Sequence, residues 1–361
     1  MKKVLLAIRS LDIGGAERYV LELAKNLDKS RFEVTIITMY DGVLDSECSV
    51  KHINLKKQGR WDIFSFLSRL HGAIKALSPD IIYTHQGEMN TFCALLKPLL
   101  KFRLAWCLHQ TFIDFSKYDK MSKLFFYLQA KLSFLPDNIV CVAEAGTQFH
   151  ANHGFDMRSS TVIKNGIDTS IFLPSNEYRL HARADHNIDD GVFIVGISAR
   201  VDYMKGYTVI AKAAQNLLAK YPNLMFVSVG KDNQPIRQEC ETLLGAYNDR
   251  FVWLGTRTKM NEIYPMFDCL VSASFGEAFS LAIAEAMSCE VPCIVTDVGD
   301  SALIVGDTGI IVQPNDTKRL SDAIEEMLRE PRDGSPCRKR IVENFSLSKN
   351  VACVEQLLLS I

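Results

Sequence analysis

Short runs of β-branched and apolar residues recur along the chain, and longer stretches with a helical spacing of apolar residues separate them. Alternation of this kind predicts parallel sheets whose strands are joined by crossover helices. The expected strands are Val4–Ile8, Val34–Thr38, Ile81–Thr84, Leu104–Leu108, Ile139–Val142, Val192–Ile197, Met225–Val229, Cys269–Val271 and Cys293–Thr296. The pattern therefore predicts an α/β fold.

The alternation is interrupted once, by the polar segment Leu173–Asp190, after which Gly191 and a clean apolar strand start a second series. A chain of 361 residues is also longer than one hydrophobic core usually supports. We expect two Rossmann-like, doubly wound parallel-sheet domains that face each other across a cleft, with a shared site at the carboxyl ends of their strands. The expected division is an N-terminal domain over 1–172, a linker over 173–190, a C-terminal domain over 191–345, and a helix over 346–361 that packs back toward the first domain.

Composition excludes several classes of protein. No stretch reaches the roughly 20 apolar residues of a membrane span, and the first residues lack the apolar region of a signal peptide. Ten cysteines occur without a CxxC pair, so we expect reduced thiols; Cys289 and Cys293 have no His or further Cys at zinc-ligand spacing. We expect a cytoplasmic protein without a nucleic-acid partner.

The net charge of −1 hides an asymmetry between the two parts of the chain. Residues 1–175 hold 22 Lys and Arg against 17 Asp and Glu, and the remainder holds 19 against 25. Within the basic part, Lys117–Leu135 mixes lysines with Phe and Leu, as an interfacial helix does. Two interpretations stay open: peripheral contact with the anionic inner face of the cytoplasmic membrane, and a core helix with solvated lysines.

The sharpest motif places Glu277 and Glu285 eight residues apart after the strand Cys269–Val271. We expect a helix from about Ala278 to Cys289 with Glu277 at its mouth, so that the two carboxylates lie on one flank about 12 Å apart along the axis. Small apolar residues surround Glu285, and a carboxylate in apolar surroundings needs a hydrogen-bond donor or a cation beside it. Hydroxyl groups of a sugar or ribose would serve, and a structural salt bridge is the alternative.

A second motif follows the strand Val192–Ile197, where Arg200 and Lys205 stand five residues apart and Gly206 opens a helix. Two cations beside a helix N-terminus suit a diphosphate, because the helix dipole and the free amides also favour an anion there. In the absence of a ligand we expect Lys205 to be a solvated turn residue.

Near the start of the chain, Gly14 and Gly15 close a strand-to-helix turn and let backbone approach a ligand. The full dinucleotide-binding fingerprint is missing, so a plain tight turn is an equal interpretation. His109 ends an apolar strand on the side that the cleft would use, and His85 occupies a similar strand end. Position alone leaves both histidines open.

The chain contains no pair of Asp residues separated by one residue, the device that holds a metal-bound nucleotide diphosphate. Phosphate-loop, HExxH and nucleophile-elbow patterns are also missing. We therefore expect no metal site and no cofactor, with protein groups meeting the charge of a leaving group.

Taken together, these motifs and the segment Val162–Asp168 resemble the family-four retaining glycosyltransferases, which have the GT-B fold. The resemblance follows the family's order over nearly the whole chain. It implies transfer of a sugar from a nucleotide-diphosphate donor to a saccharide or polyprenyl-linked acceptor, in bacterial polysaccharide, lipopolysaccharide or glycolipid synthesis. The implied mechanism is front-face transfer with retained configuration.

By the same resemblance, His109 lies by the sugar, Arg200 and Lys205 neutralise the diphosphate, Glu277 contacts the sugar, and Glu285 holds the ribose. The catalytic set is His109, Arg200, Lys205 and Glu277, and the donor-binding set is Gly14, Gly15, Arg200, Lys205, Glu277, Ala278, Phe279, Ser280, Leu281 and Glu285. Two segments depart from the family pattern: Gly299–Leu303 lacks the usual Gly-Gly and later Glu, and Gly230–Gln234 lacks the usual Gly-x-Gly.

Two other functions remain open on the sequence. A GT-B epimerase of nucleotide sugars would share the two-domain fold and would turn over without an acceptor. A binding protein that has lost catalysis would keep the fold without hydrolysing a donor. The sequence does not select the base or sugar of a donor, since the motifs address the parts that all donors share.

Overall fold

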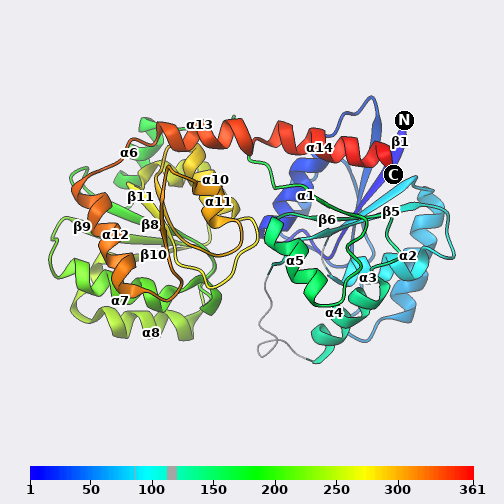
Figure 1. The fold of residues 1–361 in the computed structure, drawn as a ribbon, viewed down its shortest axis with the longest axis horizontal. Coiled ribbons are helices and arrows are strands. Elements are labelled where there is room, and N and C mark those ends of the chain that lie inside the picture. Colours follow the sequence, from blue (N-terminus) through cyan, green and yellow to red (C-terminus); the bar gives the residue numbers. More distant parts are fainter. Residues whose placement is uncertain (86, 112–119) are drawn as a thin grey trace. The chain divides into compact units, whose positions relative to one another are not determined.

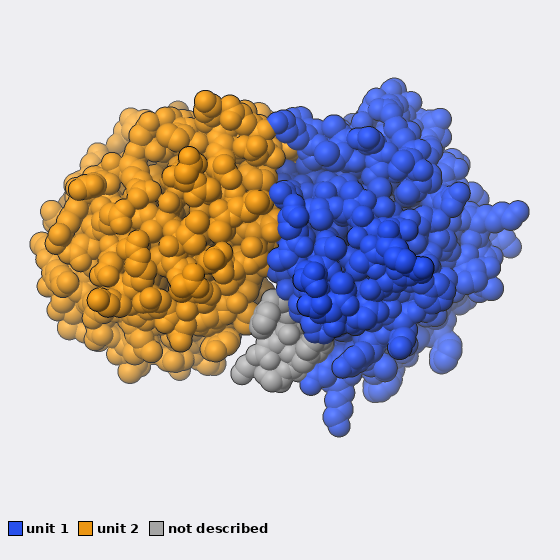
Figure 2. Space-filling view, in the orientation of Figure 1, with its two compact units in different colours: residues 1–166, 348–361 blue, residues 167–347 orange. Residues whose placement is uncertain are grey.

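The computed structural model describes residues 1–85, 87–111 and 120–361, and the chain divides into two compact units (Figure 1). Unit 1 comprises residues 1–166 and 348–361, and unit 2 comprises residues 167–347; Figure 2 colours them separately. Each unit contains a parallel sheet with helical connections, which confirms the predicted fold class.

The sheet of unit 1 has the strand order β3-β2-β1-β4-β5-β6-β7, with every described pairing parallel. Its strands are β1 (Lys2–Ile8), β2 (Phe32–Thr38), β3 (Lys51–Asn54), β4 (Ile81–His85), β5 (Arg103–Leu108), β6 (Asn138–Cys141) and β7 (Ser160–Val162). The described helices are α1 (Gly15–Asn26), α2 (Phe64–Leu77), α3 (Gly87–Leu96), α4 (Lys120–Leu132), α5 (Glu144–Asn152) and most of α14 (Leu347–Ser360).

The sheet of unit 2 has the order β10-β9-β8-β11-β12-β13, again parallel throughout. Its strands are β8 (Phe193–Ser198), β9 (Leu224–Val229), β10 (Phe251–Gly255), β11 (Cys269–Ser272), β12 (Cys293–Thr296) and β13 (Ile310–Val312). Its helices are α6 (Asn176–Asp185), α7 (Tyr207–Leu218), α8 (Gln234–Leu244), α9 (Met260–Ile263), α10 (Leu281–Ser288), α11 (Ser301–Val305), α12 (Thr317–Arg329) and α13 (Ser335–Asn344).

Helix spacing explains how these helices pack. In α7, Val209, Ile210, Ala213 and Leu217 recur at the three- and four-residue spacing of one helix face, and all four are buried. This face joins α8, α12 and the sheet in one hydrophobic core, and α7 contacts both α8 and α12. Unit 1 has its own core around Phe66, Phe92 and Trp106.

Each sheet has one switch point, where neighbouring strands lead to connections in opposite directions. It lies between β1 and β4 in unit 1 and between β8 and β11 in unit 2. Ligands of open parallel sheets bind outside the carboxyl ends of the strands at such a point. The fold therefore directs attention to the loops that follow these four strands.

All nine expected strands are present, with ends that differ by at most two residues. The four that hydrophobic runs did not indicate are β3, β7, β10 and β13, which form the four edges of the two sheets. An edge strand has one neighbour and is partly solvated, so its sequence need not form a continuous apolar run.

The boundaries of the units differ from the predicted ones, because residues 173–190 are an integral part of unit 2. Arg183 in α6 is buried and donates to Asp268 Oδ2 at 2.7 Å, and Arg179 donates to Asp268 Oδ1 at 2.7 Å. The charges that gave this segment its linker-like composition hold α6 against the residues that precede β11.

The segment predicted to form a C-terminal helix does so as α14, and its residues 348–361 belong to unit 1. Lys2 donates from Nζ to the carbonyl oxygen of Leu358 at 2.9 Å, and Glu355 accepts from the amide of Asp28 at 2.8 Å. Among the described residues, no helix is both long and apolar enough to span a membrane. None of the ten cysteines forms a disulfide.

Candidate functional site

Two loops meet at the switch point of unit 2, one after β8 and one after β11. Gly206 has φ +68°, and a Cβ there would lie 2.0 Å from the carbonyl oxygen of Ala273, so only glycine permits this approach. The amide of Phe275 donates to the carbonyl oxygen of Met204 at 2.8 Å. These contacts bring the Arg200–Lys205 motif and the Glu277 motif together.

Lys205 and Glu277 form an ion pair, with Nζ 2.6 Å from Oε1. Ser274 donates from its hydroxyl group to the same carboxylate oxygen at 2.7 Å. The expectation of a solvated turn lysine was therefore wrong, because the loop contacts place the ammonium group beside a carboxylate. The result is a preformed charged cluster at the carboxyl end of β11.

The predicted helix start at Ala278 was also wrong, because α10 begins at Leu281 and Glu277 lies in the preceding loop. The amide of Asp300 donates to the carbonyl oxygen of Ala278 at 2.9 Å, which ties this residue to another loop instead of the helix. Glu277 and Glu285 consequently do not share one helix flank. The N-cap residue Ser280 makes no side-chain cap, so the first amides of α10 are available to an anion.

Glu285 lies in α10 and is half-buried. The hydroxyl group of Tyr264 donates to Glu285 Oε2 at 2.7 Å and lies 3.0 Å from the hydroxyl oxygen of Ser198. Burial raises the pKa of Tyr264 well above its usual value, and the Glu285 carboxylate adds to the rise. The partner that the apolar surroundings of Glu285 required is thus a tyrosine that orients the carboxylate.

The remaining donor-binding candidates of unit 2 divide into side chains that a ligand could reach and side chains in the core. Arg200 follows β8 and is exposed. Phe279 is buried, and its ring lies 5.4 Å from that of Phe345, so its side chain supports the loop. Ala278 and Leu281 are half-buried, which leaves main-chain groups as their means of contacting a donor.

Each of the two segments that depart from the family pattern, Gly299–Leu303 and Gly230–Gln234, contains a glycine that packs closely against the backbone of another loop. Gly299 has φ +54°, and a Cβ there would lie 2.1 Å from the carbonyl oxygen of Glu277. Gly230 has φ +156°, and a Cβ there would lie 1.9 Å from the carbonyl oxygen of Ala199. Both glycines support the loops that carry Glu277 and Arg200, respectively.

In unit 1, the Gly14–Gly15 turn leads from β1 into α1. Gly14 is the N-cap residue of α1 and Gly15 is its first residue. Gly14 has an extended backbone and no side chain that could cap the helix. The first amides of α1 therefore receive no hydrogen bond acceptor from that residue. Glu17 lies in the first turn, and its carboxylate would crowd a Cβ at Gly14.

The structure brings His85 and His109 together, with Nδ1 of His85 3.0 Å from Nε2 of His109. His85 ends β4 and is fully buried, whereas His109 follows β5 and is half-buried. Burial lowers the pKa of His109 to about 4 and, with a smaller contribution from His109, lowers that of His85 well below its usual value. Both rings are therefore neutral near pH 7, and Tyr19 packs edge-on against each at 5.8 Å.

Cys107 joins these histidines because it pairs with His85 in the sheet and precedes His109 by two residues on the same strand face. One donor atom from each of His85, Cys107 and His109 lies within 4.8 Å of the other two. Two imidazoles and a thiol suit Zn²⁺ in chemical type. Burial raises the pKa of Cys107 to about 12, so in this state the sulfur is a thiol. The strand-end positions of His85 and His109 were visible in the sequence, but no pattern there connected Cys107 with them.

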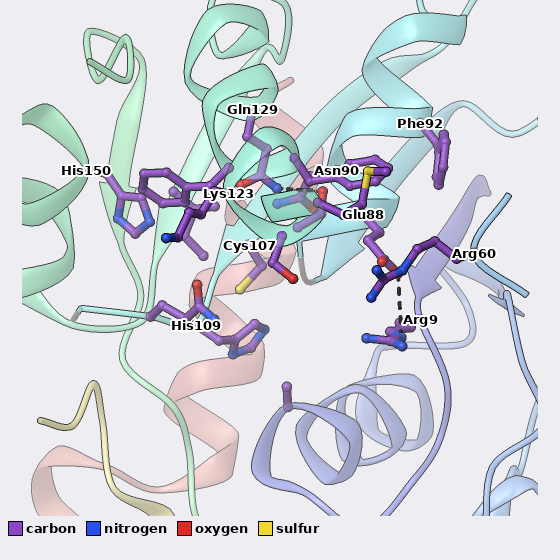
Figure 3. A pocket seen from close by; sticks show the side chains of 18 of the residues that line it. Arg9, Arg60, Glu88, Asn90, Phe92, Cys107, His109, Lys123, Gln129 and His150 are labelled. Carbon is purple, nitrogen blue, oxygen red and sulfur yellow. Dashed lines mark hydrogen bonds and ion pairs between the residues drawn. The ribbon is translucent and has the colours of Figure 1, made fainter. Parts of the chain in front are cut away.

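His109 lines a cavity of about 530 Å³ in unit 1, shown in Figure 3. The walls come from the residues after β1, β2 and β3, from β5 and the residues that follow it, and from helices α1, α3, α4 and α5. Arg9, Lys57, Arg60 and Lys123 contribute basic groups, and Phe92, Met121, Phe125 and Phe126 contribute apolar surface. The cavity therefore suits a ligand with an anionic part and an apolar part.

Several residues of these sites escaped the sequence analysis. Tyr264 and Ser274 support the carboxylates of unit 2 from positions without a motif. Arg9, Lys57 and Arg60 are separated along the chain, and the basic charge of residues 1–175 was the one sign of them.

Comparison with known proteins agrees with the division of the chain into two units. Residues 13–171 match the model of the Glycosyltransferase Family 4, and residues 192–330 match that of the Glycosyl transferases group 1. The N-acetyl-alpha-D-glucosaminyl L-malate synthase of Bacillus anthracis is 22% identical and covers 96% of this chain and 93% of its own length.

Two further proteins match over nearly their whole length. The UDP-Gal:alpha-D-GlcNAc-diphosphoundecaprenol alpha-1,3-galactosyltransferase of Escherichia coli is 23% identical, over 96% of this chain and 93% of its own. The crystal structure of Anabaena HepE in complex with UDP-glucose has a TM-score of 0.88 and 18% identity, with all of both chains covered. Because the two family models together cover most of the chain in the order of the two units, this protein belongs to the family-4-type glycosyltransferases of the GT-B fold.

Proposed function

We propose that this glycosyltransferase is a retaining enzyme that requires no metal ion and transfers a sugar from a nucleotide diphosphate to a saccharide or lipid-linked acceptor. The proposal depends above all on the Lys205–Glu277 ion pair beside the uncapped start of α10. An ammonium group and free helix amides can meet the charge of a diphosphate without a cation. The names of the relatives favour bacterial polysaccharide or glycolipid synthesis, and UDP-sugars are the first donors to test.

In this proposal, unit 2 holds the donor. Arg200, Lys205 and the first amides of α10 contact the diphosphate, Glu285 accepts from ribose hydroxyl groups, and Glu277 accepts from a sugar hydroxyl group. Tyr264 fixes the Glu285 carboxylate before the ribose arrives. Such preorganisation reduces the reorganisation that binding would otherwise require.

The transfer breaks the bond between the anomeric carbon and the leaving phosphate oxygen. The leaving oxygen accepts the proton of the acceptor hydroxyl group, and the acceptor oxygen forms its bond to the anomeric carbon on the same face. Negative charge grows on the diphosphate during this step. Lys205 and Arg200 are proposed to stabilise that charge, which makes their contribution larger in the transition state than in the bound donor.

His109 contributes a neutral ring to the proposed sugar contact. His85 Nε2 is buried and has no hydrogen-bond partner among the described residues. A buried N–H without a partner costs more than a buried acceptor, which favours a proton on His85 Nδ1 that is donated to His109 Nε2. The Nδ1 of His109 then carries its own proton and can donate to a sugar hydroxyl oxygen.

We also propose that α4 contacts an anionic membrane. Leu124, Tyr127 and Leu128 are exposed large apolar residues on this helix, and Phe134 follows it. Lys120 and Lys131 are exposed on the same helix, whereas the predicted Lys117 lies outside the described residues. At low salt, the folded protein should sediment together with anionic liposomes. A folded protein that stays in the supernatant would contradict the proposal.

A panel of nucleotide sugars tests the proposed function. A donor at 100 times its dissociation constant should stabilise the protein by about 2.7 kcal/mol, which a thermal-shift assay detects. The best donor should then support transfer that EDTA leaves unchanged, and NMR of the product should show retained anomeric configuration. Inverted configuration would refute the retaining mechanism, and loss of activity in EDTA with recovery in Mg²⁺ would refute metal independence.

A further inference from the structure

Neighbouring strands of the unit 1 sheet bring two imidazole rings and a thiol together. His85 on β4 and Cys107 on β5 are partners in the parallel register, so their side chains leave the same face of the sheet from adjacent strands. His109 follows Cys107 by two residues and belongs to the same face. The register of the strands therefore creates this group of side chains, independently of any local motif.

The distances within the group suit a small metal ion. One donor atom of each side chain lies within 4.8 Å of the other two, and Nδ1 of His85 lies 3.0 Å from Nε2 of His109. A tetrahedral zinc ion, with bonds of about 2.0 Å to nitrogen and about 2.3 Å to sulfur, holds such atoms about 3.3–3.6 Å apart. Small rotations of the side chains reach that spacing. Within residues 1–85, 87–111 and 120–361, no other three His, Cys, Asp or Glu side chains form such a group.

Aromatic packing holds the two imidazole rings in place. The Tyr19 ring of α1 packs edge-on against both histidines, with ring centres 5.8 Å apart in each pair. The ring of Tyr83, two residues before His85 on β4, lies 4.5 Å from the ring of His85. Tyr19 and Tyr83 are themselves buried and restrict the conformations of the histidines. Side chains that are already restrained lose little entropy when an ion binds.

The group can be reached from the cavity of unit 1. His85 and Cys107 are fully buried, whereas His109 is half-buried, and both Cys107 and His109 line the cavity (Figure 3). An ion in the cavity therefore meets the His109 ring first. The chemistry of the three groups then selects the ion, because a thiolate and two imidazoles favour Zn²⁺ over Mg²⁺, which prefers oxygen ligands.

We propose that His85, Cys107 and His109 form an inhibitory Zn²⁺ site, and the inhibition, though not the binding, rests on the proposed function. Zn²⁺ forms one bond to Cys107 Sγ and one to each ring, and the thiol releases its proton to solvent as the Zn–S bond forms. The ion takes the place of the proton between the two rings, and that proton moves to His85 Nε2. No group is oxidised or reduced.

The surroundings of the site favour reversible binding. His85 Nε2 is buried without a hydrogen-bond partner among the described residues, so the proton that moves there meets no acceptor. Histidines that bind metals usually donate this proton to a carbonyl or carboxylate group, and loss of such a partner costs about tenfold to a hundredfold in metal affinity. Once bound, Zn²⁺ fixes the His109 ring and places a positive charge beside the proposed sugar contact. The ion then stops transfer without taking part in it, in keeping with a mechanism that requires no metal.

Titration of the metal-free whole protein with Co²⁺ tests the site directly, because Co²⁺ substitutes for Zn²⁺ and absorbs light when a thiolate binds it. We expect a cobalt–thiolate charge-transfer band that stoichiometric Zn²⁺ abolishes. Cys107→Ala should remove this band and weaken Zn²⁺ binding at least about a hundredfold, more than the loss of an outer partner. The matched control Cys93→Ala removes another buried cysteine of unit 1 and should keep both. A band that persists in Cys107→Ala, or no band in the parent, would overturn the site.

His85→Asn provides a second test that leaves the cysteine in place. Asn can still donate toward His109 but has no imidazole nitrogen, so this variant should lose most of the Zn²⁺ affinity. If Cys107→Ala does not fold, His85→Asn decides the question, and an affinity equal to that of the parent would overturn the proposal.

Transfer assays connect the site to activity and separate it from the proposed function. Saturating Zn²⁺ should lower transfer by the parent and by Cys93→Ala about tenfold, the effect expected when His109 loses about one hydrogen bond to the sugar. Zn²⁺ should leave Cys107→Ala as active as before, and equal inhibition of this variant and the parent would overturn the inhibitory role. If no donor supports transfer while the cobalt band depends on Cys107, the proposed function fails and the metal site stands; transfer without the band removes the metal site alone.

Discussion

The charged groups at the two switch points are balanced in different ways. In unit 2, Lys205 is paired with Glu277, and Glu285 accepts from Tyr264. In unit 1, basic side chains line the cavity, and main-chain carbonyl oxygens accept hydrogen bonds from the ammonium group of Lys57. A carboxylate that pairs with an ammonium group fixes both side chains before a ligand arrives, whereas carbonyl oxygens hold an ammonium group in place and leave its charge. We therefore expect mutations of the paired charges in unit 2 to lower the transfer rate, and mutations of the basic side chains that line the cavity of unit 1 to change ligand affinity.

The largest effect should follow Lys205→Ala. Loss of one preorganised charge partner should lower the transfer rate about a hundredfold to a thousandfold, with a smaller change in donor KM. The variant should also lose about 1–3 kcal/mol in free energy of unfolding, because Glu277 loses its ionic partner. Steady-state kinetics and urea unfolding measure the two effects.

The matched control is Lys259→Ala, which removes an exposed lysine that pairs with Glu262 in the same unit. We expect the control to retain the activity and the stability of the parent. Nearly full transfer by Lys205→Ala would show that the pair in unit 2 is structural, and the contrast between the two units would fail.

Acid should destabilise unit 1 more than unit 2. Burial lowers the pKa of His150 from 6.5 to about 4, so between these values the unfolded chain binds a proton that the folded chain does not. Stability should fall as the pH falls through this window, with no further loss from this residue below about pH 4. The contribution of His150 should decrease by about 2 kcal/mol between pH 7.5 and pH 5, out of a total of about 3 kcal/mol.

Urea unfolding at both pH values measures this loss. His150→Asn should flatten the pH dependence, because Asn does not titrate and can donate as Nδ1 does to the carbonyl oxygen of Gly146. His181→Asn, at an exposed histidine in unit 2, should leave the pH dependence as it is in the parent. Equal acid sensitivity of His150→Asn and the parent would show that this histidine is not held neutral.

The smallest effect concerns His85, proposed as a positioning residue behind His109. His85→Phe removes the hydrogen bond to His109 Nε2. It should lower kcat about tenfold, the effect expected from the loss of about one hydrogen bond, with little change in KM. His85→Asn can still donate from a similar position and should recover most of the rate. Equal rates for His85→Phe and the parent, with both folded, would remove the positioning role.

Much of this protein could be predicted from local pattern. The nine buried strands were visible because a strand covered on both sides requires a continuous apolar run, and the edge strands β3, β7, β10 and β13 were not because one side is open. The motifs around Arg200, Lys205, Glu277 and Glu285 were visible because each lies within a short stretch of sequence. These patterns were sufficient for the fold class and the family.

The remaining features depend on contacts between distant residues. The polar segment 173–190 has the composition of a linker, but its arginines reach Asp268 and make it part of unit 2. Glu277 lies outside α10 because the carbonyl groups before the helix contact another loop. Gly299 packs against the carbonyl oxygen of Glu277, and the amide of Asp300 donates to that of Ala278. Neither outcome is encoded in the local helical pattern.

The sequence by itself determined the nine interior strands and the charged groups that stand at strand ends, because apolar periodicity and strand-end chemistry are local properties. Only the tertiary structure decided which charges are balanced. Lys205 meets Glu277 because β8 and β11 are neighbours and Gly206 allows their loops to touch. Arg9, Lys57 and Tyr40 converge because β1, β2 and β3 are adjacent, so residues after those strands reach one edge of the sheet. The energy of a charge depends on its neighbours in space, and strand order sets those neighbours.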